Sequence, residues 1–99
     1  MTASPPLDAA STVVVAPDVL STRLGSEHVM LNLRDGTYYG LDEVGSRIWM
    51  LLQTPIQVAG ICDVIAGEYD VDADRCRADV FRLLHELMRR GLVEIRTSP

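Results

Sequence analysis

The spacing of apolar residues divides the chain into an extended first part and a helical second part. Between Val13 and Leu41, short β-branched runs alternate with turn residues, and apolar side chains recur at every second position. After Leu41 the apolar period lengthens to about 3.6 residues, which is typical of amphipathic helices. The pattern therefore predicts an α+β domain with its strands before its helices.

Three strands are expected, joined by two tight turns. The expected strands are Val13–Ala16 with Val19–Leu24, Glu27–Leu33, and Thr37–Leu41. Pro17-Asp18 interrupts the first strand. Gly25-Ser26 favours a hairpin turn with glycine first, and Asp35-Gly36 predicts a hairpin turn with both central residues at positive φ. The strands should therefore form a three-stranded antiparallel meander.

Three helices should follow. They are expected from the N-cap Asp42 to Gln53, from Thr54-Pro55 to about Glu68, and from the N-cap Asp72 through Ala73 to Arg90, where Gly91 ends the last one. The apolar residues expected to face inward from the first two helices are Val44, Ile48, Trp49, Leu52, Val58, Ile61, Cys62 and Ile65. A short extended tail, Leu92–Ile95, completes a winged helix-turn-helix-like arrangement.

The third helix has a wider apolar arc than one packing partner requires. Leu83, Cys76, Leu87 and Val80 cluster within about 60° at ~100° per residue. A second row extends the arc and consists of Leu84, Met88 and Phe81, with Arg77 among them. The opposite side carries Asp79, Arg82, Glu86 and Arg89, a solvated face. Either the rest of the fold covers the second row, or that row lines an apolar groove beside the sheet. Helical periodicity alone does not distinguish between these two arrangements of the second row.

Composition and length narrow the function classes. With 99 residues, 47% of them apolar, the chain suits one small domain, expected over residues 13–96 after a disordered tail at residues 1–12. The net charge of -5 disfavours a phosphate-binding surface. No apolar run approaches the ~20 residues that a bilayer requires, and no secretory signal is visible. Two cysteines make no disulfide framework, so a cytoplasmic location without membrane attachment is expected.

No arrangement of residues points to catalysis, a metal or a cofactor. His28 and His85 lack neighbouring ligands at metal spacing, and Cys62 and Cys76 lie fourteen positions apart, with no CxxC motif. The glycines form no phosphate-binding loop. We therefore expect a non-enzymatic binding protein with no catalytic residues.

Two binding architectures fit three strands followed by three helices. A winged helix-turn-helix regulator inserts its third helix into DNA, whereas a peptide adaptor adds an extended segment to a sheet edge. The third helix has arginines interleaved with acids and contains no Asn or Gln. Nucleic-acid binding is therefore the less favoured alternative.

The segment from Leu31 to Val93 contains LNLRDGTYYGLD, VGSRIWMLL, a helix started by Thr-Pro, ADVFRLLHEL and GLV, together about two thirds of the chain. On these residues the segment resembles the PqqD-like family. Members of this family are recognition elements for ribosomally made, modified peptides. The resemblance implies an adaptor that binds the leader segment of a precursor peptide and presents it to processing enzymes.

The resemblance also implies where the leader lies, along the third strand and against the third helix. The strand residues it implies are Thr37, Tyr38, Tyr39, Gly40 and Leu41, which would offer backbone hydrogen bonds. The groove-wall residues it implies are Arg77, Val80, Phe81 and Leu84. From the pleat itself, Tyr39 and Leu41 share one face of the sheet and Tyr38 points to the other.

The chain most resembles the separate leader-binding protein of lasso-peptide pathways. There the partners would be the precursor leader peptide, a cysteine-protease-type leader peptidase and an asparagine-synthetase-like cyclase. The alternatives are another modified-peptide pathway, such as pyrroloquinoline quinone biosynthesis, or the winged-helix DNA-binding regulator.

Overall fold

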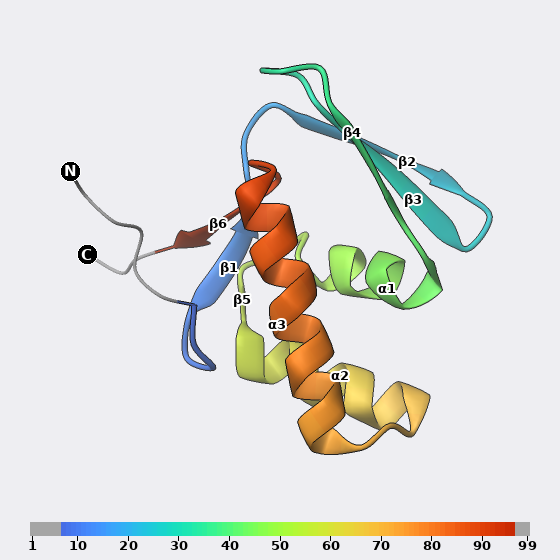
Figure 1. Ribbon diagram of the computed structural model, residues 1–99, viewed down its shortest axis with the longest axis vertical. Coiled ribbons are helices and arrows are strands. Elements are labelled where there is room, and N and C mark those ends of the chain that lie inside the picture. Colours follow the sequence, from blue (N-terminus) through green and yellow to red (C-terminus); the bar gives the residue numbers. More distant parts are fainter. Residues whose placement is uncertain (1–6, 97–99) are drawn as a thin grey trace.

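A computed structural model describes residues 7–96 (Figure 1). These residues form three helices and six strands, and the strands are arranged in two sheets. In chain order the elements are β1 (Thr12–Val15), β2 (Val19–Leu24), β3 (Glu27–Asn32), β4 (Tyr38–Leu41), α1 (Glu43–Leu51), β5 (Ile56–Gln57), α2 (Val58–Tyr69), α3 (Ala73–Arg89) and β6 (Val93–Arg96). The expected α+β class, with strands ahead of three helices, is confirmed.

The meander is confirmed as the sheet β2-β3-β4, with β4 at one edge. Gly25 has a φ of +65°, as expected for a turn with glycine first. The second turn differs from its prediction because Gly36 has a positive φ and Asp35 does not. The Asp35 carboxylate instead accepts hydrogen bonds from the Thr37 N–H and Oγ at 3.0 and 2.7 Å, a local turn built by the side chain.

The segment before Pro17 does not join the meander, so the prediction that it forms part of the first strand is wrong. It forms β1, which pairs with β5 on one side and β6 on the other in a second antiparallel sheet. Asp18 has a φ of +61°, and this left-handed residue redirects the chain between β1 and β2. The C-terminal extended tail is confirmed as β6.

Helix α2 begins later than the sequence pattern predicts. Instead of starting the helix, Pro55 precedes β5, because Ile56 pairs with Val13 of β1. The first amides of α2 then find backbone partners: Val58 N–H donates to the Ser11 carbonyl at 3.0 Å and Ala59 N–H to the Ala9 carbonyl at 2.9 Å. Residues 7–12, expected to be part of a disordered tail, are thus ordered, whereas residues 1–6 lie outside the described residues.

The caps of the other two helices are as predicted. The Asp42 carboxylate accepts from Gly45 N–H at 2.8 Å, and the Asp72 carboxylate accepts from Arg75 N–H at 3.1 Å. Gly91, with a φ of +72°, follows the end of α3 as the expected C-terminal glycine.

One hydrophobic core joins both sheets to all three helices. Its buried members include Val13, Met30, Trp49, Ile61 and Leu87, one from each of five elements. Figure 1 shows α3 running between the β5-β1-β6 sheet and the pair formed by α1 and β4. One side of α3 therefore faces the β5-β1-β6 sheet, and only the other side faces the edge of the meander.

Candidate functional site

The edge strand β4 has unpaired backbone groups at two positions. Asn32 N–H donates to the Thr37 carbonyl at 2.9 Å, which makes Asn32 and Thr37 a hydrogen-bonded pair. Such pairs alternate along an antiparallel ladder, so Tyr39 and Leu41 direct their N–H and C=O groups toward β3. Tyr38 and Gly40 consequently direct theirs toward the open edge, where an added strand would bind.

Of the five strand residues implied by the family resemblance, Thr37 is not part of this open edge. It precedes β4, its N–H is bonded to the Asp35 carboxylate, and its carbonyl is bonded to Asn32. These two hydrogen bonds within the chain occupy its backbone groups. The side chains follow the expected alternation: Leu41 is buried, Tyr39 is half-buried and Tyr38 is exposed.

A groove of about 710 Å³ lies between β4 and α3. Its floor and its β4 side are formed by Tyr39, Gly40, Leu41, Asp42, Val44, Gly45, Ile48, Ile65, Tyr69 and Val71. Its α3 side is formed by Arg75, Cys76, Asp79, Val80, Arg82, Leu83 and Glu86. An apolar floor with charged residues along one rim suits an extended peptide that carries apolar side chains.

The groove lies on the other side of α3 from the row implied by the resemblance. Of the four helix residues expected in its wall, only Val80 lines it, and Val80 is almost wholly buried. Leu84 has no exposed surface at all. The Arg77 guanidinium lies 5.5 Å from the centre of the Phe81 ring, away from the groove-lining residues.

Both apolar rows of α3 contribute to the core. Of the row expected to face inward, Cys76, Val80 and Leu87 are buried. Leu84 belongs to the same buried cluster as Val13 of β1 and Val93 of β6. Of the second row, Leu84 is buried, whereas Phe81 and Met88 are only partly buried. Leu83, expected in the core, is left partly exposed beside β4.

The face of α3 expected to be only solvated forms the rim of the groove. Asp79, Arg82 and Glu86 all line it. Val44, expected inside, is 37% exposed and also lines it. The alternation of apolar and charged residues on this side of α3 was visible in the sequence, but nothing in it showed that β4 lies opposite.

Most charges on the rim are paired within α3. Arg82 contacts Asp79 at 3.2 Å, and Glu86 accepts from Arg89 at 2.9 Å. The hydrogen bonds from Arg90 and Arg89 hold the pKa of the Glu86 carboxyl below its ordinary value. Among the described residues, Arg75 is the rim cation that makes no ion pair, so a carboxylate of a bound peptide could pair with it.

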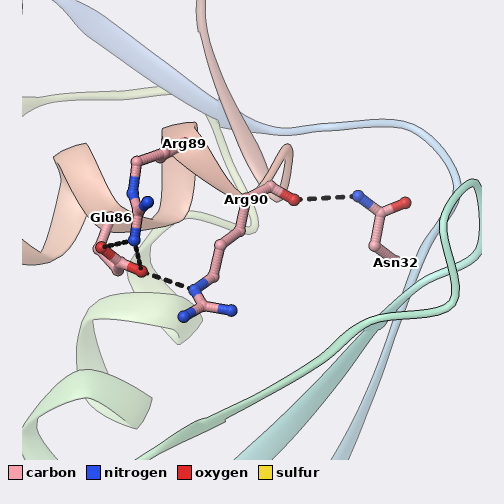
Figure 2. Close-up of polar contacts among 4 residues, drawn as sticks. All are labelled: Asn32, Glu86, Arg89 and Arg90. Atoms are coloured by element: carbon pink, nitrogen blue, oxygen red, sulfur yellow. Dashed lines mark hydrogen bonds and ion pairs between the residues drawn. The ribbon is translucent and has the colours of Figure 1, made fainter.

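The C-terminal end of α3 is fastened to the meander at one end of the groove. The Asn32 side chain donates to the Arg90 carbonyl at 3.0 Å, and the Arg90 side chain bonds to Glu86 (Figure 2). The Arg90 guanidinium also lies 4.8 Å from the centre of the Tyr39 ring. These contacts fix the distance between the helix and the edge strand.

At the floor of the groove, α1 approaches β4 closely because Gly45 has no side chain. A Cβ at this position would lie 2.9 Å from Leu41 Cδ2 and 3.2 Å from Asp42 Oδ1. The glycine thus lets the start of α1 pack directly against the end of the edge strand. A Cβ added at Gly40, in contrast, would meet no atom within 4 Å.

The described residues contain no group of side chains arranged to hold a metal ion. Burial raises the pKa of both Cys62 and Cys76, which lowers the fraction of each thiol that is ionised. Across residues 7–96 we find no helix with the length and apolarity to cross a membrane.

Comparison with solved structures identifies three chains of the same fold. TbiB1, in complex with the TbiA(beta) leader peptide, is 38% identical, with a TM-score of 0.79 over 86% of this chain and 99% of that one. A lasso peptide synthetase B1 complexed with its leader peptide is 21% identical, with a TM-score of 0.74 over 82% and 95% of the two chains. No curated protein sequence matches.

The third structure is the PqqD truncation of Methylobacterium extorquens PqqCD, described as a stand-alone recognition element for ribosomally synthesized and modified peptides. It is 19% identical, with a TM-score of 0.74 over 90% of this chain and 95% of that one. The winged helix-turn-helix-like fold is thus shared across all three. The family model for coenzyme PQQ synthesis protein D matches residues 27–93, from the start of β3 to the start of β6. The chain therefore belongs to the PqqD family, whose members are non-catalytic binding domains.

Proposed function

We propose that this protein binds the leader segment of a ribosomally made precursor peptide as an additional strand on β4. Backbone hydrogen bonds to Tyr38 and Gly40 would supply affinity that depends little on the leader's sequence. Apolar leader side chains would enter the groove against Leu83 and Val44, and these contacts would supply specificity.

The observation that carries the proposal is the combination of an open sheet edge with an apolar groove directly beside it. An exposed edge strand is usually protected in soluble proteins, because its unpaired groups invite association. Here the edge is short and adjoins Leu41 and Leu83, whose side chains line a groove of about 710 Å³. TbiB1, at 38% identity, was solved with a leader peptide bound, which supports the same class of ligand here.

Substitutions on the two sides of α3 test the position of the leader. A labelled TbiA(beta) leader peptide is titrated with the protein and followed by fluorescence anisotropy. Leu83→Ala should weaken binding at least about tenfold, which corresponds to ~1.4 kcal/mol. Phe81→Ala is the matched control, since Phe81 is also a partly buried apolar residue of α3 but lies away from the groove.

Thermal unfolding of both variants accompanies the titration, so that a loss of folding is recognised. Binding that depends on Phe81 and not on Leu83 would contradict the proposal, because the leader would then lie on the side of α3 away from the groove. Absence of saturable binding by the wild-type protein would contradict leader recognition itself.

The DNA-binding alternative predicts a different result in the same assay. Duplex DNA would have to bind tightly with a steep dependence on salt. On the exposed side of α3, Arg82 and Arg89 are already paired with Asp79 and Glu86, which leaves little net positive charge for phosphates. We expect the leader to bind with little salt dependence and DNA not to bind.

For the pathway, we propose lasso-peptide biosynthesis, with a cysteine-protease-type leader peptidase and an asparagine-synthetase-like cyclase as partners. The support is the resemblance of the sequence to the leader-binding protein of such pathways. Genes for a short precursor, a peptidase and a cyclase beside this one would support the proposal. A radical enzyme gene there would favour the quinone-cofactor pathway instead.

A further inference from the structure

Tyr39 of the edge strand is held by contacts on two sides. In the β3-β4 ladder it lies directly opposite Met30, which is fully buried, and it packs against the hydrophobic core. The Arg90 guanidinium lies 4.8 Å from the centre of the Tyr39 ring, within the range of a cation–π contact. A residue that directly follows α3 is thus fastened to a side chain of the edge strand.

Arg90 is itself fixed by two further contacts. Its Nε donates to Glu86 Oε2 at 2.6 Å, one turn back along α3, and its carbonyl accepts from the Asn32 side chain at 3.0 Å (Figure 2). Asn32 is 3% exposed, so the carbonyl is attached to a buried part of the sheet. The guanidinium therefore has little freedom to leave the Tyr39 ring.

The register of β4 would place a leader side chain next to this ring, a step that rests on the proposed function. Tyr38 and Gly40 would form hydrogen-bonded pairs with an added antiparallel strand, so the leader residue opposite Tyr39 would belong to a non-hydrogen-bonded pair. In such pairs the α-carbons are only ~4.5 Å apart, and both side chains lie on the same face of the sheet. Because Tyr39 lines the groove, that leader side chain would enter the groove against the Tyr39 ring.

Arg90 does not itself form part of the groove. Among residues 7–96, the lining of the groove includes Tyr39 and Glu86 but not Arg90. Any effect of Arg90 on the leader would therefore pass through the side chains that it holds. Ordering a single side chain when a ligand binds lowers the affinity roughly two- to tenfold, and a side chain that is already ordered avoids this loss.

We propose that Arg90 is a positioning residue for leader binding, which acts by holding the Tyr39 ring where it lines the groove. The guanidinium covers the ring from the side of α3, so the ring is ordered in the free protein. The leader then meets a preformed surface at this end of the groove. Arg90 would thus raise the affinity for the leader without touching it.

The test compares two neighbouring arginines. Arg90→Gln removes the guanidinium from the Tyr39 ring. Arg89→Gln is the matched control, because Arg89 donates to the same Glu86 carboxylate at 2.9 Å but, among the described residues, lies over no aromatic ring. Both variants lose one positive charge and one ion pair with Glu86, so a difference between them reports the contact with the ring.

Leader affinity is measured by anisotropy with the labelled TbiA(beta) leader peptide, on full-length variants that thermal unfolding shows to be folded. We expect Arg90→Gln to weaken binding about fivefold and Arg89→Gln to change it by less than about twofold. Tyr39→Phe keeps the ring and should match wild type. Tyr39→Leu removes the ring, so adding Arg90→Gln to it should have an effect of less than about twofold in a double-mutant cycle.

NMR spectra of the leader-free protein with ¹³C-labelled tyrosine provide a second readout. Arg90→Gln should shift the ring signals of Tyr39, because the cation no longer lies over the ring. Arg89→Gln should leave these signals unchanged. A purely structural role of Arg90 in the end of α3 would lower the melting midpoint without this selective change.

Wild-type affinity in Arg90→Gln, or an equal loss in both arginine variants, would overturn the inference while leaving leader recognition intact. A fivefold loss that persists in the Tyr39→Leu background would also overturn it, since Arg90 would then contact the leader directly. Tyr39 signals that Arg90→Gln does not change would exclude the positioning role. Failure of the wild-type protein to bind the leader would contradict the proposed function instead, and the first titration detects it.

Discussion

Replacing Tyr38 with proline removes one of the two backbone donors that β4 directs toward the open edge. The ladder register assigns the Tyr38 N–H to the edge and the Tyr39 N–H to β3. Proline is tolerated on an edge strand when the lost N–H points outward. We therefore expect Tyr38→Pro to fold and Tyr39→Pro to disrupt the pairing of β3 with β4.

The expected loss of affinity follows from the number of edge groups. Tyr38 and Gly40 together offer two donors and two acceptors to an added strand. Losing one donor removes a hydrogen bond worth about 1 kcal/mol and leaves a leader carbonyl without a partner, which costs about 1–3 kcal/mol. We expect a total near 2 kcal/mol, or roughly thirtyfold weaker leader binding.

Ser21→Pro is the matched control on the opposite edge of the same sheet. Ser21 lies opposite Met30, whose backbone groups face β4, so the Ser21 N–H also points away from its neighbour strand. This variant should bind the leader as wild type does. Anisotropy measures the affinity, and thermal unfolding should show a change in midpoint of no more than about 8 °C for either variant.

The reasoning fails if folded Tyr38→Pro binds the leader with wild-type affinity, because strand addition then cannot be the mode of binding. It also fails if Ser21→Pro weakens binding equally, since the effect would then come from the sheet as a whole. A Tyr39→Pro variant with unchanged stability would show that the assigned register is incorrect.

Three further substitutions test the framework of the groove. Asn32→Ala removes the bond to the Arg90 carbonyl and should lower stability by about 2 kcal/mol, or the melting midpoint by roughly 10 °C, in thermal unfolding. Leu84→Ala should lower stability by about 2–5 kcal/mol in denaturant titration, whereas leader binding by the folded fraction should stay unchanged, because Leu84 is wholly buried. Glu86→Gln should be less stable than wild type above the ordinary carboxyl pKa of 4.5, since Arg90 and Arg89 lower the pKa of the folded state. That difference should disappear as the pH falls through the lowered pKa, and chemical denaturation at several pH values measures it.

Local signals along the chain were sufficient to predict the meander and two of the helix starts. Alternating residues and the Gly25 turn define β2 and β3, and each prediction depends only on neighbours in sequence. Asp42 and Asp72 cap their helices through amides three residues away. Gly91 ends α3 through its own left-handed backbone. Interactions this short in range are encoded locally, so they could be predicted from sequence alone.

The tertiary structure alone decided where β1 pairs and where α2 begins. Val13 pairs with Ile56 and Ile95, residues separated from it by more than forty positions. No local pattern reports such pairing. The backbone carbonyls of Ala9 and Ser11 then replace a side-chain cap on α2, so the Thr54-Pro55 signal was overridden.

The position of the groove was decided in the same way. The width of the apolar arc on α3 showed that the helix has two packing sides, but both sides are apolar enough to face a core. In the folded chain Leu84 is buried in the core that both sheets share, whereas Leu83 lines the groove beside β4. Helical periodicity specifies which residues of α3 share a face. The partner that covers each face depends on strands that are distant in the sequence. For this reason the sequence by itself could propose the groove but not the side of α3 on which it lies.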